Sequence, residues 1–345
     1  MSASSAFSFA DSTKWLVLPR LEVRSMNAQP AWWCVGAPGP MAACGLAHSL
    51  CDNFGQGTQD LKGVAIVWHH FELRGEYIRS GPSSSFQDFH AHQHRAAALI
   101  NDNDYASGSK TLAGQPTVRG DGVVTLILAL DGMASVDLDA IEQRLNCGRL
   151  AGGNIVDHQF KVARSDLASA SIKGRLIHDE WAGVMARVRS GHAFVDRSEL
   201  IEEAMASGAK DPLDAFLLCT QLASSASRAQ DKKASDKAAH TSYAVPRSAW
   251  LAPYLAGYYG LTPAQPRRMA RDGHPHAFVE PLIGLGQFLS IRSTGVIPFW
   301  DYKTDADGVY RVQETNCFGG IKPAAKAYEH RAAAKSTSGV PHVHQ

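Results

Sequence analysis

The feature that most constrains this chain is the apolar run Val-Val-Thr-Leu-Ile-Leu-Ala-Leu at residues 123–130, which lies between Gly122 and Gly132. β-Branched and leucine side chains in an unbroken run are typical of a central strand that is covered on both faces. A strand of this kind needs neighbouring strands and helices to bury it. With 345 residues, 45% hydrophobic and 19% charged, the chain is far from the composition of disordered proteins and can bury a sizeable core.

One β-α-β unit precedes this run, and a second unit begins with it. The first has a strand at residues 15–24, with Pro19 indicating an edge or a bulge, a helix from Pro40 to about Phe54, and a strand at residues 63–71. The second unit begins with residues 123–130, continues through a helix that ends at Gly148, and returns as a strand at residues 150–156. Two such units predict a split βαββαβ arrangement, a ferredoxin-like sheet with helices on one face.

The remainder of the chain changes from a helical pattern to a linker composition and then to a strand-rich pattern. Residues 166–227 have a mostly helical pattern with a short apolar interlude at 193–195, and residues 224–248 have the composition of a mobile linker. Near the C-terminus, Asp305-Ala306-Asp307-Gly308 predicts a hairpin between residues 297–304 and 308–314. We therefore expect an α+β chain with three parts: a ferredoxin-like (RRM-like) body at 1–165, a helical insertion with its linker at 166–246, and a β-rich continuation of the body with a peripheral tail at 247–345.

Charge and cysteine content narrow the function classes. Lys and Arg number 34 and Asp and Glu 33, so net charge gives no argument for nucleic acid, and any basic surface must be local. The six cysteines form no CxxC pair, which indicates a reduced cytoplasmic chain without a zinc ribbon or a disulfide framework. No targeting segment or apolar stretch of about 18 residues is present, so we expect no membrane association.

Closely spaced glycines occur in three places: residues 36–40, residues 148–154 and residues 284–286. Glycines allow backbone amides to approach a phosphate, and Arg149 adds a positive charge to the second cluster. A helix cap with a tight turn explains the same residues without any ligand, and the alternative stays open. Because residues 123–130 contain no aromatic side chain, base stacking on that strand is not expected, and RNA would be held by loops and helix termini.

Histidines provide the candidates for catalysis and metal binding. His90, His92 and His94 are a plausible metal pocket by ligand type, although no Asp, Glu or Cys is tied to them by spacing. His69 and His70 at a strand end could hold a general base, but a histidine that packs or binds RNA is the simpler interpretation. His178-Asp179 is explained as a surface pair. Without a GxSxG, HExxH, Walker A or GxGxxG motif in the right context, we expect no metal and no cofactor.

Several motifs recur in an order that matches a known family. In chain order they are Leu18-Pro19-Arg20-Leu21, Asn27-Ala28, residues 36–40, Arg149-Leu150-Ala151-Gly152-Gly153, Trp250-Leu251-Ala252-Pro253, Ala256-Gly257-Tyr258, Phe278-Val279-Glu280 and Gly284-Leu285-Gly286. With them the sequence resembles the family of the second Csy subunit, the Cas-five-type protein of type I-F CRISPR surveillance (Cascade) complexes. The likeness covers most of the chain. The histidine-rich loop at residues 86–94 matches no part of the family pattern.

The resemblance implies a non-catalytic, antiviral subunit that clamps the 5′ handle of the CRISPR RNA and helps present target double-stranded DNA. It also implies that the ferredoxin-like body at 1–165 is of the RAMP type and binds RNA. The implied protein partners are the large subunit, the Cas-seven-type backbone subunits and anti-CRISPR proteins. The expected RNA contacts are Arg20, Arg24, Asn27, Gly36, Gly39, Arg149, Gly152, Gly153, Asn154, Gly284 and Gly286. The expected DNA contacts are Arg228, Lys232, Lys233 and Lys237.

Three alternatives stay open at this level. A compact type I-F variant lacks the large subunit, and there the inserted helical module reads the DNA motif beside the target. A metal-independent endoribonuclease that processes precursor CRISPR RNA would recruit His70, Tyr77 and Lys62. A metal enzyme would instead use His90, His92 and His94.

Overall fold

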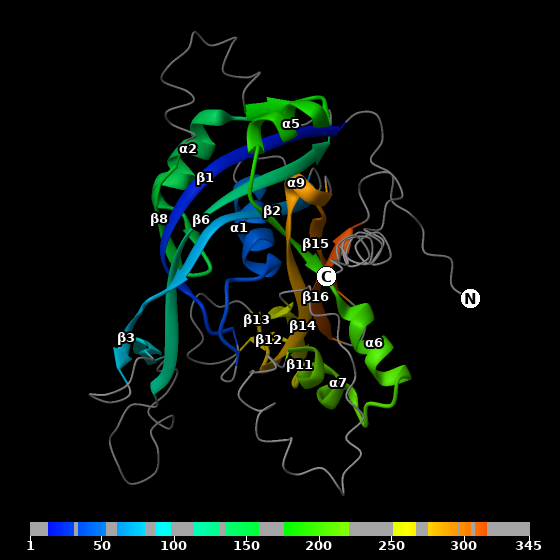
Figure 1. Cartoon of the computed structure of the whole chain (residues 1–345). Coiled ribbons are helices and arrows are strands. Elements are labelled where there is room, and N and C mark those ends of the chain that lie inside the picture. Colours follow the sequence, from blue (N-terminus) through cyan, green and yellow to red (C-terminus); the bar gives the residue numbers. More distant parts are fainter. Residues whose placement is uncertain are drawn as a thin grey trace, which may run out of the picture.

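The computed structural model describes residues 13–30, 34–52, 61–79, 87–97, 114–131, 136–158, 176–220, 251–266, 275–294, 297–304 and 308–315. These residues form an α+β structure around one large antiparallel sheet, as expected (Figure 1). The path through this sheet is β10-β14-β11-β16-β15-β2-β6-β1-β8-β7, with β5 paired to β6 and β9 paired to β1.

The strands of the large sheet are β1 (Thr13–Asn27), β2 (Leu61–Leu73), β5 (Gln93–Ala97), β6 (Gly114–Asp131), β7 (Arg149–Leu150), β8 (Gly153–Asp157), β9 (Ile177–His178), β10 (His192–Asp196), β11 (Leu251–Gly260), β14 (Val279–Ser290), β15 (Phe299–Thr304) and β16 (Val309–Thr315). Two small sheets pair β3 (Gly75–Arg79) with β4 (Gln87–Ala91) and β12 (Gln265–Pro266) with β13 (Pro275–His276). The helices are α1 (Pro40–Asp52), α2 (Leu138–Cys147), α5 (Trp181–Val188), α6 (Ser198–Ala206), α7 (Pro212–Thr220) and α9 (Ile291–Thr294).

The N-terminal part of the sheet has the local order β2-β6-β1-β8, and every neighbouring pair is antiparallel. Helix α1 connects β1 to the β2 side, and α2 lies between β6 and the β7–β8 hairpin. The apolar run at residues 123–130 lies in β6 between β1 and β2, so its predicted central position is confirmed. The irregularity expected near Pro19 is also present, because the β1–β6 register shifts between Leu18 and Leu21.

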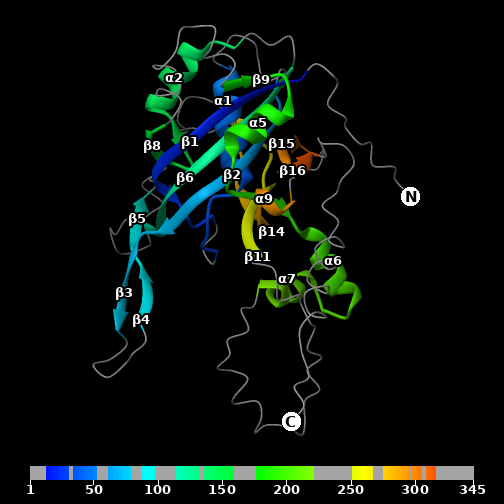
Figure 2. The same cartoon turned by 45° about the horizontal axis from the view of Figure 1, so that its top comes forward.

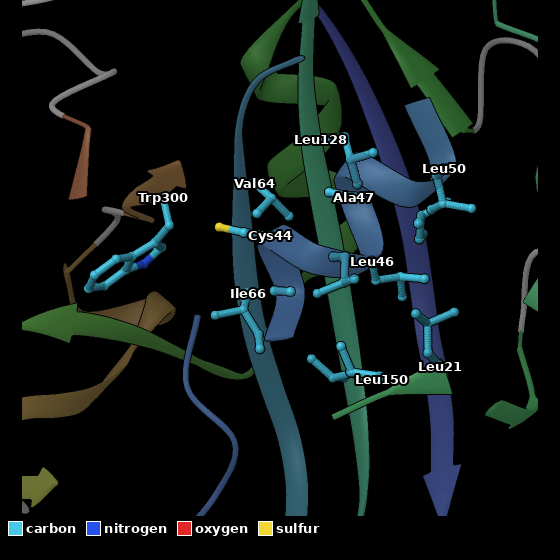
Figure 3. Close-up of a cluster of buried hydrophobic side chains, with 14 of the residues drawn as sticks. Leu21, Cys44, Leu46, Ala47, Leu50, Val64, Ile66, Leu128, Leu150 and Trp300 are labelled. Atoms are coloured by element: carbon cyan, nitrogen blue, oxygen red, sulfur yellow. The ribbon is translucent and has the colours of Figure 1, made fainter. Parts of the chain in front are cut away.

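Helices cover the two faces of this sheet unequally. On one face, Cys44 and Ala47 of α1 pack against strand residues such as Ile66 and Leu128, as Figure 3 shows, and α2 joins the same cluster. On the other face, α5 and α9 bury a second cluster that includes Val17 of β1. Beyond the buried Pro19 this second face of β1 becomes polar, with Arg20 and Arg24 exposed and Glu22 half-buried, which leaves one half of the face open.

The segment after residue 176 contributes strands as well as helices. The predicted strand at residues 193–195 is confirmed as β10, which pairs with both β14 and β2, so the segment expected to be helical also adds to the main sheet. The predicted C-terminal hairpin is confirmed as β15–β16, although its tip at residues 305–307 lies outside the described residues. The linker, the four expected DNA contacts (Arg228, Lys232, Lys233 and Lys237) and the tail after Lys326 lie outside them too.

The long connection between β2 and β6 carries the β3–β4 hairpin and strand β5. The hairpin projects from the end of β2 that lies away from α5 (Figures 1 and 2).

Within the described part of the chain, no helix has the length and apolar character needed to span a membrane.

Candidate nucleic-acid interface

Three polar residues expected to contact RNA form one row on the open half of the sheet. Arg24 of β1 is paired with Asn154 of β8, and Asn154 is paired with Arg149 of β7. Directly paired residues of antiparallel strands place their side chains on the same face. All three residues are exposed, so the sequence-predicted contacts from two distant segments meet on one surface. We call Arg24, Asn154 and Arg149 the basic row.

Two glycines allow the β7–β8 hairpin to hold this position. Ala151 and Gly152 both have positive φ angles, 51° and 74°, which is the geometry of a two-residue type I′ turn. A Cβ atom on Gly153 would lie 2.6 Å from the backbone nitrogen of Met26, so only glycine lets the hairpin lie this close to β1. The N–H of Asn27 then donates to the carbonyl of Ala151 at 2.8 Å and fixes the end of β1 beside the turn.

The arginines in and near the basic row differ in whether their guanidinium groups already have a hydrogen-bond partner in the described part of the chain. Arg24 donates from Nε and Nη2 to one oxygen of Glu22, at 3.0 and 2.8 Å, on an exposed surface. No hydrogen bond or ion pair occupies the exposed guanidinium groups of Arg20 and Arg149 within the described part of the chain. Two cations are therefore free to meet an anion here, and a third is shared with a carboxylate.

Arg20 is positioned by a bulge of β1. Its φ angle is 48°, and its N–H donates to Oγ1 of Thr125 at 3.0 Å. The same hydroxyl lies 2.7 Å from Nε2 of His69. Burial, followed by the positive charges of Arg20 and His192, lowers the pKa of His69 to about 4. A histidine with this pKa is neutral near pH 7 and is a weak general base, so His69 adds no second positive charge beside Arg20.

Sequence reasoning missed two further arginines at this surface. Arg119 of β6 donates to the carbonyl of Ser25 at 3.1 Å, and Arg74, directly after β2, donates from Nε to both oxygens of Asp121 at 3.0 Å. Asp121 also accepts the N–H of Ser25 at 2.7 Å. Burial opposes ionisation of Asp121, but the bonds from Ser25 and Arg74 outweigh it and lower its pKa. Neither arginine carries a local sequence signal, because only the strand register brings Arg119 to Ser25 and Arg74 to Asp121.

The other expected glycines have different surroundings. Gly36 donates its N–H to Ala28 at 2.9 Å and so lies just beyond the end of β1. A Cβ atom on Gly39 or Gly284 would meet Tyr254, at 3.2 and 2.6 Å, and one on Gly286 would fall within the ring of Phe194. Packing of aromatic rings therefore explains Gly39, Gly284 and Gly286, which are buried away from the basic row. Their contact with RNA stays a prediction.

The residues of the alternative endoribonuclease do not converge. Lys62 forms an ion pair with Asp131 at 3.2 Å near the start of β2, and His70 lies 3.5 Å from Glu72 near its end. At about 3.3 Å per residue, Lys62 and His70 are roughly 26 Å apart along β2. Tyr77 is a third, separate position on the β3–β4 hairpin.

The candidate metal ligands give no complete site. His90 and His92 are exposed at the end of β4, and the side chain of His94 lies outside the described residues. Where side chains are described, no group of three or more His, Cys, Asp or Glu is arranged to hold a metal ion. His178 packs over Gly183 of α5, consistent with a structural position.

Comparison with known proteins agrees with the resemblance seen in the sequence motifs. The family model described as CRISPR-associated protein (Cas_Csy2) matches residues 16–312. A curated relative, the CRISPR-associated protein Csy2 of Pseudomonas aeruginosa (strain UCBPP-PA14), is 27% identical over 326 residues, covering 88% of this chain and 96% of the relative. The predicted likeness to the second Csy subunit of type I-F systems is confirmed. Because the matched region includes both faces of the sheet and the basic row, the chain belongs to the Cas_Csy2 family of CRISPR-associated proteins.

Proposed function

We propose that this chain is a non-catalytic, cytoplasmic subunit of a type I-F CRISPR surveillance complex and that it clamps the 5′ handle of the CRISPR RNA on the open half of its sheet. The observation that carries the proposal is the register that aligns Arg24, Asn154 and Arg149 across three strands. Arg20 and Asn27 on β1 flank this row, and Gly152 keeps the turn beside it open. Arginine and backbone amides are the groups that bind a phosphate strand without reading its sequence.

We further propose that residues 1–165 form a ferredoxin-like body, that residues 166–246 are an insertion, and that residues 247–345 complete the body. The strand order β2-β6-β1-β8, with α1 and α2 packed on one face, supports this interpretation. In such a body the face opposite the two helices is the one that can meet a ligand. Here α5 covers half of it, and the basic row lies on the other half.

The assembly around this subunit is also a proposal. Family membership favours contacts with Cas-seven-type backbone subunits, with a large subunit unless the complex is the compact variant, and with anti-CRISPR proteins. We propose that the insertion, at residues 166 to about 248, faces the DNA entry side, where Lys232, Lys233 and Lys237 attract the target duplex without reading its sequence. Changing all three lysines to Ala should slow capture of target DNA by the assembled complex while RNA loading is preserved. Loss of RNA loading with normal DNA capture per loaded complex would show that the insertion faces the handle.

Handle binding is tested by Arg149→Ala, read as the dependence of RNA affinity on salt. Each phosphate contact released should lower the slope of log K against log salt by about 0.7 for a single strand. The matched control is Arg311→Ala, which removes an exposed arginine of β16. Three strands, β15, β2 and β6, separate β16 from β1 in the sheet, so the slope should stay unchanged. An unchanged affinity and slope for Arg149→Ala would remove the β7–β8 hairpin from the RNA site.

The endoribonuclease alternative has a direct test. Labelled precursor CRISPR RNA is incubated with the protein, alone and in the complex, without metal. We expect no specific product, because Lys62, His70 and Tyr77 are held at separate places. A product cut at the handle boundary that disappears in His70→Ala would make the enzyme the better interpretation.

A further inference from the structure

Near its end, β1 places two residues opposite one residue of β6. Val23 and Met26 are both buried in the cluster that α1 and α2 cover, although residues three apart on a regular strand point to opposite faces. The β1–β6 register shifts between these two residues. Arg24 and Ser25 consequently lie opposite the single residue Asp121, which makes this point a β-bulge. The bulge keeps Arg24 exposed on one face and returns Met26 to the core on the other.

Side chains of β6 hold the bulge in place. Ser25 has a φ angle of 63°, in the left-handed region that residues other than glycine seldom adopt. The carboxylate of Asp121 accepts the Ser25 N–H at 2.7 Å, and the guanidinium group of Arg119 donates to the Ser25 carbonyl at 3.1 Å. Arg74 fixes the carboxylate in turn, because its Nε donates to both oxygens at 3.0 Å. Both backbone polar groups of the left-handed residue are thus bonded by side chains of one neighbouring strand.

The bulge lies between the two contacts that join β1 to the β7–β8 hairpin. On one side of Ser25, Arg24 is paired with Asn154. On the other side, the N–H of Asn27 donates to the carbonyl of Ala151 at 2.8 Å. If Ser25 left the left-handed region, the residues after it would turn to the opposite face of the sheet, and these two contacts could not form together. The alignment of the basic row therefore depends on the conformation of Ser25.

We propose that Asp121 is a positioning residue of the RNA site, which strengthens RNA binding by holding the Ser25 bulge although it is a carboxylate on the phosphate-binding face. The inference rests on the proposed function and adds to it a residue that acts through the backbone of β1 without touching RNA. The Asp121 side chain is 30% exposed and close enough to Arg24 for their charges to attract each other. Charge alone predicts weaker RNA binding, because a carboxylate repels a nearby phosphate. The oxygens of Asp121, however, bond Ser25 and Arg74, whereas Glu22 occupies the Arg24 guanidinium itself.

The test measures the affinity of the full-length protein for handle RNA over a series of salt concentrations. Asp121→Ala should weaken binding by about 5- to 30-fold, the factor by which an unsupported left-handed residue is disfavoured, because only the bulged form aligns the basic row. The slope of log K against log salt should not fall, since the bound form keeps its phosphate contacts. Arg149→Ala, by contrast, should lower both the affinity and the slope.

A second substitution tests whether Asp121 acts through Ser25. Glycine adopts left-handed φ angles without the cost that other residues incur, so Ser25→Gly added to Asp121→Ala should restore most of the lost affinity. Asp121→Asn keeps an oxygen that can accept the Ser25 N–H and should lose less affinity than Asp121→Ala. Glu202→Ala, at an exposed acid of α6, is the matched control and should leave the affinity unchanged. Circular dichroism establishes that each variant is folded.

The outcomes separate this inference from the proposed function. If the unaltered protein binds no handle RNA, the proposed function fails, and this inference fails with it. If Arg149→Ala weakens binding but Asp121→Ala binds equally or more tightly than the parent, only the positioning role is overturned. A double variant that binds no better than Asp121→Ala would overturn it as well, because Asp121 would not act through Ser25. If Asp121→Ala does not fold, Asp121→Asn takes its place: weaker binding that Ser25→Gly restores supports the inference, and equal or tighter binding overturns it.

Discussion

Glu22 should weaken RNA binding, so removing its charge should improve it. Its carboxylate occupies both Nε and Nη2 of Arg24, the donors that a phosphate would use on the basic row. Glu22→Gln keeps the shape of the side chain and its position on β1 while it removes the charge. The expected result is a tighter complex with handle RNA, an effect opposite to that of most substitutions at a binding site.

The size of the gain follows from two contributions. The Arg24–Glu22 pair is exposed, with side-chain accessibilities of 60% and 38%, so solvent screens it and breaking it to free Arg24 makes only a small contribution. Repulsion between this carboxylate and a phosphate about 5 Å away in water adds roughly 0.8 kcal/mol before salt screening. With screening we expect a net gain of about 1 kcal/mol, which is an approximately five-fold lower Kd.

The assay is a fluorescence anisotropy titration of labelled handle RNA at a series of salt concentrations. Glu22→Gln should bind about five-fold more tightly at moderate salt, and the difference should shrink as salt rises. Glu280→Gln, an exposed acid at the start of β14, is the control and should have no effect. If Glu22→Gln leaves the affinity unchanged or lowers it, Arg24 does not contact the RNA, and the proposed path over the basic row is wrong.

Three further predictions concern the supports of the site and the core. Gly153→Ala should lower the free energy of unfolding by about 2 kcal/mol and also weaken RNA binding, because the added Cβ pushes the hairpin away from β1. Gly286→Ala should lower the free energy of unfolding by about 1–3 kcal/mol, because the added Cβ displaces the ring of Phe194. Burial, aided by the charges of Asp196 and Glu199 and opposed by a bond from the Asp196 N–H, raises the pKa of Glu314 to about 7 from its ordinary value of 4.5. The stability that this carboxyl group contributes in its protonated form is complete below pH 4.5 and is lost as the pH rises to about 7, so Glu314→Gln should flatten that part of the stability curve.

Thermal and chemical unfolding monitored by circular dichroism measure all three effects, with RNA titrations alongside. Gly152→Ala is the matched control for the unfolding measurement on Gly153→Ala, and not for its RNA titration, because its Cβ would meet nothing closer than 3.9 Å and only the positive φ costs about 1–2 kcal/mol. Equal RNA affinity for Gly153→Ala and the unaltered protein would contradict the role of the hairpin. A loss of RNA binding in Gly286→Ala would show that β14 belongs to the site. A Glu314→Gln variant with the same pH profile as the parent would mean that folding does not raise the pKa of Glu314.

The central strands could be predicted because their sequence is dominated by one requirement. The run at residues 123–130 is apolar on both faces since helices cover both sides of β6 at that point. The β15–β16 hairpin was equally predictable, because its turn has a local signature. In each case short-range chemistry and burial point to the same structure.

The basic row could be named residue by residue but not assembled from the sequence. Its geometry depends on the β1–β8 register, which shifts between Glu22 and Val23. It also depends on the course of β1, whose pairing with β6 is irregular at Arg20 and Ser25, two residues with positive φ that are not glycine. No local pattern specifies such bulges, because hydrogen bonds to Thr125 and Asp121 in a distant strand stabilise them. The bonds of Arg119 to Ser25 and of Arg74 to Asp121 were unpredictable for the same reason.

Glycine motifs were the least decisive sequence signal. The spacing in Gly284 and Gly286 resembles that of a phosphate loop, yet each glycine makes room for an aromatic ring from another strand. A missing side chain can admit either a ligand or a protein ring, and only the tertiary structure distinguishes these uses. Gly152 differs from them because its turn faces open space beside Arg119.

The most direct test of the central claim is photo-cross-linking of handle RNA to the subunit in the assembled complex, with the cross-linked peptides identified by mass spectrometry. The account predicts cross-links on the peptides that carry residues 20–27 and 149–154, the two segments that form the basic row with its flanking residues. Cross-links confined to the strands β11, β14, β15 and β16, with none on those two segments, would contradict it.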